Sequence, residues 1–548
     1  MIDCVLVGHN QIEFDEYADY LEKMGSSCAL DDFRLNYFKY EGNRWHLAKT
    51  INTLRKNTES AISLNLNSFY FSNTIAYLGS FLNRNNLTFD YVHSFQQDKF
   101  KLRDMLIKKK INCIAITTTY YLVVEPIKEI VEFIKKYNPN VKIIVGGPFI
   151  ANQVVYFENT DYLYSLFDEI GADIYINSNQ GEKTLLEVIN YLKKNLKLYN
   201  ISNIYFKEEN KYKYLSSQEE ENILANNPVK WSLFEQDLNK CVNIRSSISC
   251  PYSCKFCGFH IRGGKFQRLK AQILKNELDC LSKIKKVKYL NFVDDLFDVP
   301  LEILKDTLKM MIRENYNYKW SCQLRCSSLD DEAVKLLKEA GCISVFLGLE
   351  SGSDKILLNM NKKAIVSDYN KGINLLKKNE ITIHGNFITG FPGENEHTIR
   401  ETVEFIKNSG IDYYRTQLWY YDQVTPIYNE RHLYGLTGSS FEWEHNTMNS
   451  KEASHIIFDI FRNLKYPIWI PQDSFFSFDS LLELYDFGFD NSNIKLILSS
   501  FKEAVCESLT NSNGNIGTDM MLNLCKAINI QTESTHVPEI KKNIFNFE

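Results

Sequence analysis

The sequence predicts a multidomain α/β protein in which two parallel β-sheet regions are followed by a mainly helical region. The chain has 548 residues, which is more than one hydrophobic core normally serves. Two separate stretches alternate short apolar segments with helical periods, the pattern of parallel strands covered by helices. We therefore expect a doubly wound parallel sheet, then a partial (β/α) barrel, then a helical cap.

The first alternation covers residues 1–194. Its connection at about residues 10–68 is long for a strand-to-helix loop and is read as an insertion. Strands are expected at residues 4–7, 89–92, 113–116, 142–145 and 173–176.

Residues 195–241 are predicted to form a linker that contains a hairpin. The second alternation, over residues 242–410, predicts the barrel, and residues 411–548 predict a C-terminal cap on the substrate side. Barrel strands are expected at residues 242–244, 289–293, 320–324, 343–347 and 382–388.

Composition limits the partners that we expect. A net charge of -5 gives no support to nucleic-acid binding, and no apolar run approaches the ~20 residues of a membrane span. Thirteen cysteines, mostly isolated among apolar residues, fit a reducing compartment. We expect a cytoplasmic protein without a membrane or nucleic-acid partner.

Three cysteines, Cys250, Cys254 and Cys257, follow the first barrel strand in the pattern CxxxCxxC. A loop that carries three thiols brings them to one small volume, as an iron–sulfur cluster requires. No fourth cysteine lies nearby with matching spacing, so one iron of such a cluster would have no protein ligand. The alternatives are a zinc site with a distant fourth ligand, and three unrelated buried thiols.

Polar residues and glycines gather at the expected carboxyl ends of the first sheet, where ligands of such sheets bind. Each of them alone is explained as a turn or helix-cap residue. Four such loops on one edge favour a large polar-edged ligand. The candidates are His9, Thr117, Thr118, Tyr120, Gly146, Gly147, Ser178 and Gly181.

The cysteine pattern, with VDDLF at 293–297, LESG at 349–352 and GNFITGFPGE at 385–394, resembles the radical S-adenosylmethionine (SAM) superfamily. The resemblance covers about residues 242–410. It implies that the three cysteines bind a [4Fe–4S] cluster and that SAM occupies the open iron. The implied SAM-binding residues are Phe256, Gly258, Asp294, Asp295, Arg325, Glu350 and Asn386.

Three of these residues have a further interpretation. Arg325, at the end of a strand, could pair with the methionine carboxylate or form a surface salt bridge. The frequent Gly-Gly-Glu of the superfamily is replaced by Asp294 and Asp295, a pattern associated with its cobalamin-dependent branch.

Residues 1–194 resemble the cobalamin-binding domain that precedes such radical enzymes. The Asp-x-His-x-x-Gly signature of a cobalt-binding histidine is missing, because His9 lacks both the Asp and the Gly. Either cobalamin binds without a protein histidine, which we favour, or the fold has lost its ligand. Within the branch, the segments VGHN at 7–10, FDYVHSF at 89–95 and WEHNTM at 443–448 are similar to the phosphinothricin-type P-methyltransferase group.

This resemblance implies methylation of an unactivated carbon or phosphinate phosphorus in a natural-product or peptide substrate, through a 5′-deoxyadenosyl radical. It also implies an electron donor such as flavodoxin or ferredoxin. The rivals are a cobalamin-binding enzyme that catalyses a non-methylating rearrangement, cyclisation or oxidation, and a non-catalytic cobalamin or metal sensor. Tyr420, Tyr421, Trp443 and His445 are candidates for the substrate wall, with core aromatic residues as the alternative.

Overall fold

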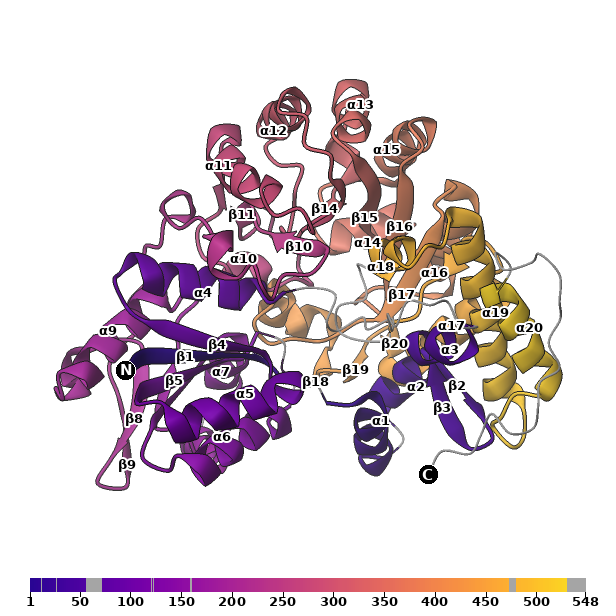
Figure 1. Ribbon diagram of the computed structural model, residues 1–548. Coiled ribbons are helices and arrows are strands. Elements are labelled where there is room, and N and C mark those ends of the chain that lie inside the picture. Colours follow the sequence, from indigo (N-terminus) through magenta and orange to yellow (C-terminus); the bar gives the residue numbers. More distant parts are fainter. Residues whose placement is uncertain are drawn as a thin grey trace.

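The computed structural model describes residues 1–10, 12–25, 27–55, 71–119, 121, 123–157, 160–472 and 480–529. Two seven-stranded sheets are present, and each lies among its own helices. In Figure 1 the first sheet lies at the left, the second at the centre, and the C-terminal helices at the right. The predicted α/β architecture is confirmed.

The first sheet has the order β4-β1-β5-β6-β7-β8-β9, and its first five strands are parallel. All five strands expected from the sequence are present. The strands are β1 (Ile2–His9), β4 (Phe89–Ser94), β5 (Ile111–Thr117), β6 (Lys142–Gly146), β7 (Ile174–Ile176), β8 (Ile204–Glu208) and β9 (Lys211–Tyr214).

Helices cover both faces of this sheet because alternate strand residues point to opposite sides. On β1, Val5 and Val7 pack on the face of α5, α6 and α8, whereas Cys4 and Leu6 pack on the face of α4 and α9. The helices are α4 (Asn73–Arg84), α5 (Phe95–Lys108), α6 (Glu125–Tyr137), α7 (Pro148–Tyr156), α8 (Thr160–Ile170) and α9 (Glu182–Lys193).

The hairpin expected in the linker extends this sheet. Strand β8 pairs with β7 in antiparallel fashion and buries Ile204, Tyr205 and Phe206. An unpaired β7 would expose a row of backbone groups, and the hairpin covers them. The remaining connector contains the short 3-10 helices η1 (Leu198–Asn200), η2 (Leu224–Asn226) and η3 (Trp231–Leu233).

The second sheet is an open barrel with the order β10-β13-β14-β15-β16-β17-β21, parallel throughout. It continues past residue 410 through β17 and β21, whose aromatic residues are buried. The strands are β10 (Cys241–Ile244), β13 (Tyr289–Phe292), β14 (Lys319–Leu324), β15 (Cys342–Glu350), β16 (Thr382–Thr389), β17 (Tyr413–Leu418) and β21 (Ile468–Trp469).

Amphipathic helices surround the barrel. They are α11 (Ala271–Ser282), α12 (Leu301–Arg313), α13 (Asp331–Glu339), α14 (Asp354–Asn359), α15 (Val366–Lys378) and α16 (Glu396–Ser409), together with η4 (Cys326–Ser328). The inner face is polar, since Asn291, Ser321 and Ser344 are register neighbours on successive strands. A polar interior suits a ligand chamber.

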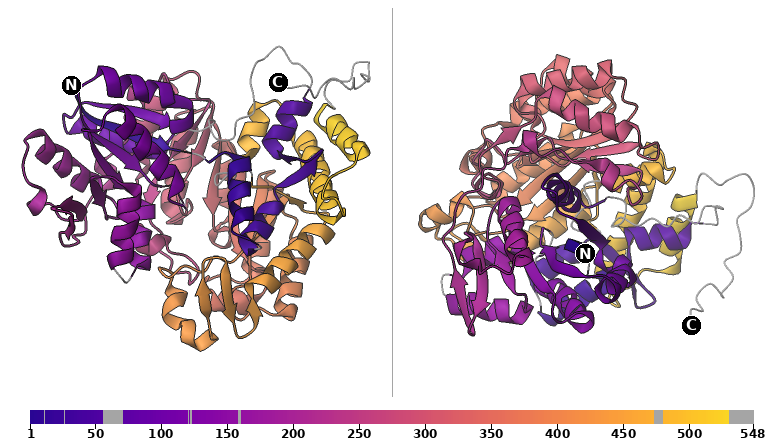
Figure 2. Two further views of the ribbon diagram at one scale, coloured as in Figure 1. Left: turned by 90° about the horizontal axis from the view of Figure 1, so that it is seen from below. Right: turned by 60° about the vertical axis from the view of Figure 1, so that its left-hand side comes forward.

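The described part of the predicted insertion lies with the C-terminal elements (Figures 1 and 2). Lys39 N donates to Ser508 Oγ at 2.9 Å, and Asn529 Nδ2 donates to Leu54 O at 2.9 Å. Residues 56–70 lie outside the described residues. The elements are α1 (Phe14–Lys23), α2 (Cys28–Arg34), β2 (Tyr37–Tyr40), β3 (Asn43–His46) and α3 (Leu47–Leu54).

The C-terminal region combines a small antiparallel sheet with helices that pack beside β17 and β21. It consists of η5 (Pro426–Tyr434), β18 (Thr437–Ser439), β19 (Glu442–His445), β20 (Met448–Asn449), α17 (Ser450–Asn463), α18 (Ser480–Asp486), α19 (Asn491–Thr510) and α20 (Thr518–Asn529). Among the described residues, no helix is both long enough and apolar enough to cross a membrane.

Candidate active site

The cysteine loop begins at a tightly held turn on the carboxyl edge of the barrel. After β10 the chain enters β11 (Ser247–Ile248), which pairs with β12 (Gln267–Arg268). The Asp294 carboxylate accepts hydrogen bonds from the amides and hydroxyls of Ser246 and Ser247, with distances of 2.6–2.8 Å for three of the four. Asp294 therefore fixes where the loop starts.

The three thiols lie along this loop at different depths. Cys254 is buried, whereas Cys250 and Cys257 are half-buried. Burial raises the pKa of Cys250, and burial raises the pKa of Cys257 to about 12. Without a metal these thiols stay protonated at neutral pH, and a bound metal would displace their protons.

Hydrogen-bond donors face two of the sulfurs. The amide of Phe259 donates to Cys257 Sγ at 3.5 Å, and Arg325 Nη1 donates to Cys254 Sγ at 3.9 Å. Such donors stabilise negative charge on thiolate ligands and tune the potential of an iron–sulfur centre. The chemistry of this donor set fits a thiolate-bound cluster.

A single metal ion fits less well. Within the described parts of the chain, no three His, Cys, Asp or Glu side chains converge closely enough to hold one ion. Zinc needs its donors around one point, whereas a [4Fe–4S] cluster binds each thiolate through a different iron atom. The zinc alternative therefore finds no support in this geometry.

Arg325 follows β14 and is buried beside the cysteine loop. Its guanidinium lies 3.9 Å from the ring centre of Tyr252, and its amide donates to Asp298 Oδ1 at 3.0 Å. It forms no ion pair with any described residue, and its buried Nη2 lacks a hydrogen-bond partner there. A buried donor without a partner is costly, so this atom is suited to bind an anionic ligand group.

Glu350 and Asn386 lie on neighbouring strands across the barrel mouth. Glu350 ends β15 in the left-handed backbone region, with φ of 64°, and its Oε1 pairs with Lys362 Nζ at 2.7 Å. Asn386 of β16 is the register neighbour of Gly348, and its buried Oδ1 has no hydrogen-bond partner among the described residues. Both side chains can accept hydrogen bonds from a ligand.

Phe256, Gly258 and Asp295 complete the predicted set. Phe256 lies between the last two cysteines and meets Phe391 edge-on at 6.5 Å. Gly258 precedes α10 (Phe259–Arg262) and lies against Arg262. Burial, with a smaller contribution from Asp294, raises the pKa of Asp295 to about 6. Asp295 interacts electrostatically with Cys250 and Cys257, so it lies near the thiols.

The carboxyl edge of the first sheet has its topological switch point between β1 and β5, because the chain leaves these adjacent strands in opposite directions. His9 ends β1, and burial lowers the pKa of its imidazole to about 4, so it is neutral. Thr117 ends β5 and donates to Val7 O at 3.3 Å, while Thr118 Oγ1 donates to Gly146 O at 3.0 Å.

The next two loops lie along the same edge. Gly147 has φ of 117° before α7, and a Cβ there would come 2.9 Å from Thr118 Oγ1. Ser178 Oγ accepts from the amide of Gly181, which begins α9 with φ of 42°. Tyr120 lies outside the described residues. Glycine is required at Gly147 and Gly181 by backbone conformation, as at many turns.

Comparison with known proteins agrees with this barrel. Residues 244–406 match the model of the radical SAM superfamily. These residues form a radical SAM domain. The sequence prediction of such a domain is confirmed, and with it the expectation of a cluster and SAM as its cofactors.

Parts of the chain are similar in sequence to two named proteins. The chain is 25% identical over 303 residues to an uncharacterized methyltransferase from Pyrococcus horikoshii, covering 52% of this chain and 64% of the relative. It is 24% identical over 187 residues to the anaerobic magnesium-protoporphyrin IX monomethyl ester cyclase from Rubrivivax gelatinosus, covering 32% of this chain and 34% of that enzyme. The chain thus spans less than two thirds of each relative.

A solved structure has a similar fold over most of the chain. The radical SAM methyltransferase TsrM from Kitasatospora setae, with cobalamin and a [4Fe–4S] cluster bound, aligns with a TM-score of 0.56 and 14% identity. The alignment covers 78% of this chain and 77% of TsrM. At this identity the likeness establishes the fold.

The predicted wall residues divide into two groups. Tyr421, Trp443 and His445 are buried, and the Trp443 and His445 rings stack with centres 5.2 Å apart. Trp443 Nε1 donates to Trp419 O at 2.8 Å, and His445 Nε2 lies 3.0 Å from Gly390 O. Tyr420 is exposed and meets Phe441 edge-on. The three buried rings have the contacts of core residues that support the radical SAM domain.

The structure adds residues that sequence reasoning missed. Lys362, in the loop after α14, pairs with Glu350, and nothing in its local sequence marks it. Arg415 lies buried on the inner face of β17, opposite Asn386, and pairs with Asp32 of α2 at 3.2 Å. A charged residue directly after two tyrosines in the strand YYRTQL was a usable signal for Arg415.

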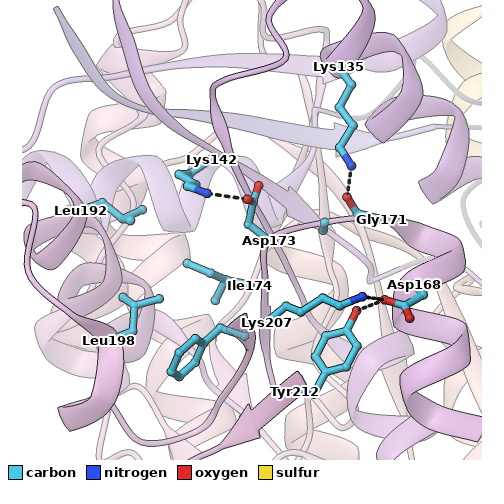
Figure 3. A pocket seen from close by; sticks show the side chains of 12 residues that line it. Lys135, Lys142, Asp168, Gly171, Asp173, Ile174, Leu192, Leu198, Lys207 and Tyr212 are labelled. Carbon is cyan, nitrogen blue, oxygen red and sulfur yellow. Dashed lines mark hydrogen bonds and ion pairs between the residues drawn. The ribbon is translucent and has the colours of Figure 1, made fainter. Parts of the chain in front are cut away.

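A separate cavity of about 390 Å³ lies at the opposite, amino edge of the first sheet (Figure 3). Four of its five charged side chains form ion pairs: Lys142 pairs with Asp173 at 2.7 Å, and Lys207 pairs with Asp168 at 2.7 Å. The fifth, Lys135, donates to the backbone carbonyl of Gly171. The cavity lies at the amino edge and does not belong to the radical SAM site.

Proposed function

We propose that this protein is a cobalamin-dependent radical SAM methyltransferase that acts on an unactivated carbon or phosphinate phosphorus of a natural-product or peptide substrate. The observation that carries the proposal is the coupling of the cysteine loop to the first sheet. Arg262 of α10 pairs with Asp422, and Asp422 Oδ1 accepts from Tyr156 OH of α7 at 3.1 Å. One carboxylate thus joins the proposed cluster and corrin units.

The residues of the radical SAM domain have distinct proposed roles. Cys250, Cys254 and Cys257 would hold the cluster. Arg325 Nη2 would bind the methionine carboxylate of SAM, because it is a buried donor in need of an acceptor. When bound, the cofactors supply radical chemistry and a transferable methyl group, while the protein supplies binding, orientation and exclusion of water.

The first sheet would hold cobalamin at its switch point. His9 is neutral at physiological pH because burial opposes its charged form, which suits contact with an uncharged ligand edge. Gly146 and Gly147 permit close backbone approach. Stacked rings behind Gly390, including Trp443, would keep the chamber between the two units rigid and dry.

The cluster assignment is tested with Cys254→Ala and the matched control Cys280→Ala. Cys280 is exposed on α11, away from the loop. We expect the anaerobically reconstituted Cys254→Ala protein to lose the cluster absorbance and essentially all reductive cleavage of SAM. The control should retain both. Cleavage that survives in Cys254→Ala would contradict the cluster assignment.

Cobalamin binding and methyl transfer are tested together. Protein produced with hydroxocobalamin and purified anaerobically should show both corrin and iron–sulfur absorption. Reaction with substrate extracts, SAM and reduced flavodoxin or ferredoxin should yield 5′-deoxyadenosine, S-adenosylhomocysteine and a product heavier by one methyl group. Absence of corrin from the folded protein would contradict the cobalamin assignment.

A second candidate is a non-methylating radical reaction, favoured by the similarity to a cyclase. It predicts 5′-deoxyadenosine without S-adenosylhomocysteine and a product without an added methyl group. A sensor without catalytic activity predicts no SAM cleavage by protein that contains an intact cluster. These three outcomes are distinguished by one chromatographic and mass analysis.

A further inference from the structure

Lys362 forms a buried ion pair with the residue at the end of β15. Its Nζ lies 2.7 Å from Glu350 Oε1, and the two side chains are only 7% and 11% exposed. Solvent screening is therefore weak, and the pair differs from the surface ion pairs elsewhere on the chain. Neither charge can be removed alone without leaving the other buried and uncompensated.

The loop that carries Lys362 also supports the cysteine loop. The amide of Lys255 donates to Met360 O at 2.9 Å, and Asn361 Nδ2 donates to Ser253 O at 3.0 Å. Lys362 Nζ itself lies 5.5 Å from the ring centre of Phe256. The ammonium group is thus held between the Glu350 carboxylate and the aromatic ring beside the cysteines.

The surrounding backbone leaves room for this pair and for little else. A Cβ on Gly348 would come 2.6 Å from Glu350 Oε1 and 3.2 Å from Lys362 Nζ. The side chain of Tyr369 on α15 interacts electrostatically with Glu350, and Cys326 interacts with Lys362. A side chain at position 348 would therefore press against the carboxylate and the ammonium group of this ion pair.

Lys362 limits the ways in which Glu350 can act. With Oε1 bound to Lys362, the carboxylate cannot turn freely, and Oε2 remains as its acceptor for a ligand. A buried ion pair contributes little net stability against apolar replacements, but it can specify one arrangement of its groups. This pair therefore matters for the orientation of the Glu350 carboxylate and not for net stability.

We propose that Lys362 is a positioning residue that fixes the Glu350 side chain, beside Phe256, in the orientation that binds SAM. The inference rests on the proposed function, because it takes this site as the SAM site. Lys362 acts through Glu350 and does not itself need to touch the cofactor.

The test is a double-mutant cycle on SAM affinity, measured by equilibrium dialysis with the full-length, anaerobically reconstituted protein. Lys362→Met should weaken binding by about tenfold or more, in the range seen for loss of residues that orient a ligand-binding group. In the Glu350→Gln background the same change should alter affinity by less than about twofold, because the group that Lys362 orients is already neutral.

Two further variants test whether the loss of affinity is specific to the cation at position 362. Lys362→Arg keeps a cation that can pair with Glu350 and should restore most of the affinity lost in Lys362→Met. Lys363→Met changes the adjacent exposed lysine and should bind SAM as the unmodified protein does. The iron content and absorption spectrum of every variant should match those of the unmodified protein, since none of these residues is a cluster ligand.

The outcomes separate the inference from the proposed function. If the unmodified protein binds SAM and Lys362→Met binds equally well, or loses the same factor with and without Glu350→Gln, the positioning role is overturned and the proposed function stands. If the cluster-containing unmodified protein does not bind SAM, the proposed function fails, and the inference with it. If Lys362→Met fails to fold, Lys362→Gln enters the same cycle with the same expectations.

Discussion

At the scale of single residues, the polar groups at the barrel mouth differ in how many hydrogen bonds they make within the protein. Asp294 accepts four hydrogen bonds from the turn before the cysteine loop and has a structural task. Arg325 Nη2 and Asn386 Oδ1 are buried without partners among the described residues. Because native proteins pair nearly all buried polar groups, these two atoms support the proposal that a polar ligand binds at the barrel mouth.

Glu277 gives a residue-scale prediction on pH. Burial raises its pKa to about 7, partly offset by the hydrogen bond from Trp231 Nε1 and by Arg245. Between about pH 4.5 and 7, the Glu277 carboxyl is protonated in the folded state and ionised in the unfolded state. The free energy of unfolding therefore falls as the pH rises through this range. Glu277→Gln should raise the free energy of unfolding by up to about 3 kcal/mol at pH 8 and by less than about 1 kcal/mol at pH 5.

Urea unfolding at the two pH values measures this effect. Exposed Glu235→Gln is the control and should change the free energy of unfolding little at either pH. Equal effects of Glu277→Gln at pH 5 and pH 8 would show that the Glu277 carboxyl does not titrate in the proposed range.

At the scale of elements, the barrel is completed by segments distant in sequence. Helix α2, from the N-terminal insertion, supplies Asp32, and Asn36 lies just beyond the end of this helix. Arg415 of β17 donates hydrogen bonds to Asn36 Oδ1 and to the Asp32 carboxylate. The amide of Gln472, after β21, donates to Asn36 Oδ1 at 2.7 Å. The insertion therefore closes the side of the barrel that is far from the cysteine loop.

Asp32 gives a prediction at this scale. Asp32→Ala leaves the Arg415 guanidinium buried without its counterion, which should lower the free energy of unfolding by about 3–5 kcal/mol. The matched control is Asp31→Ala, whose surface pair with Arg34 at 3.6 Å should contribute less than about 1 kcal/mol. Denaturant unfolding compares them, and equal losses would contradict the role of the buried pair.

At the scale of the whole molecule, the two sheets meet through few polar contacts around the cysteine loop. Asp422, which follows β17, pairs with Arg262 and accepts from Tyr156 OH, so three segments converge on one side chain. Burial and the neighbouring Asp422 carboxylate both raise the pKa of Tyr156, so its phenol keeps the donated proton. This side chain therefore contributes a polar link between the carboxyl edges of the two sheets, beside the apolar core that they share.

Asp422 gives the whole-molecule prediction. Asp422→Ala should speed amide hydrogen exchange in α7 and α10 by about tenfold, the effect of losing roughly 1.4 kcal/mol of local stability. Exposed Asp459→Ala on α17 is the control. Exchange measured by mass spectrometry should change at both helices together, and unchanged rates in either helix would refute the link between the two units.

Much of the fold was predictable because its signals are local. The five expected strands in each sheet are short apolar runs between helical periods, and burial of both faces gives such runs their composition. The cysteine pattern and the glycines of the turns were likewise readable, since thiol spacing and left-handed backbone are properties of short segments.

The sequence by itself thus determined the two parallel sheets, the radical SAM domain and the loop that carries its three cysteines. Only the tertiary structure decided that the hairpin extends the first sheet, that the insertion packs on the C-terminal elements, and that Lys362 holds Glu350. Tyr156 and Asp422 are 266 residues apart in sequence, and Asp32 and Arg415 are 383 apart. Such pairs leave no periodic signal, because they form only when the packing of whole units brings their side chains together.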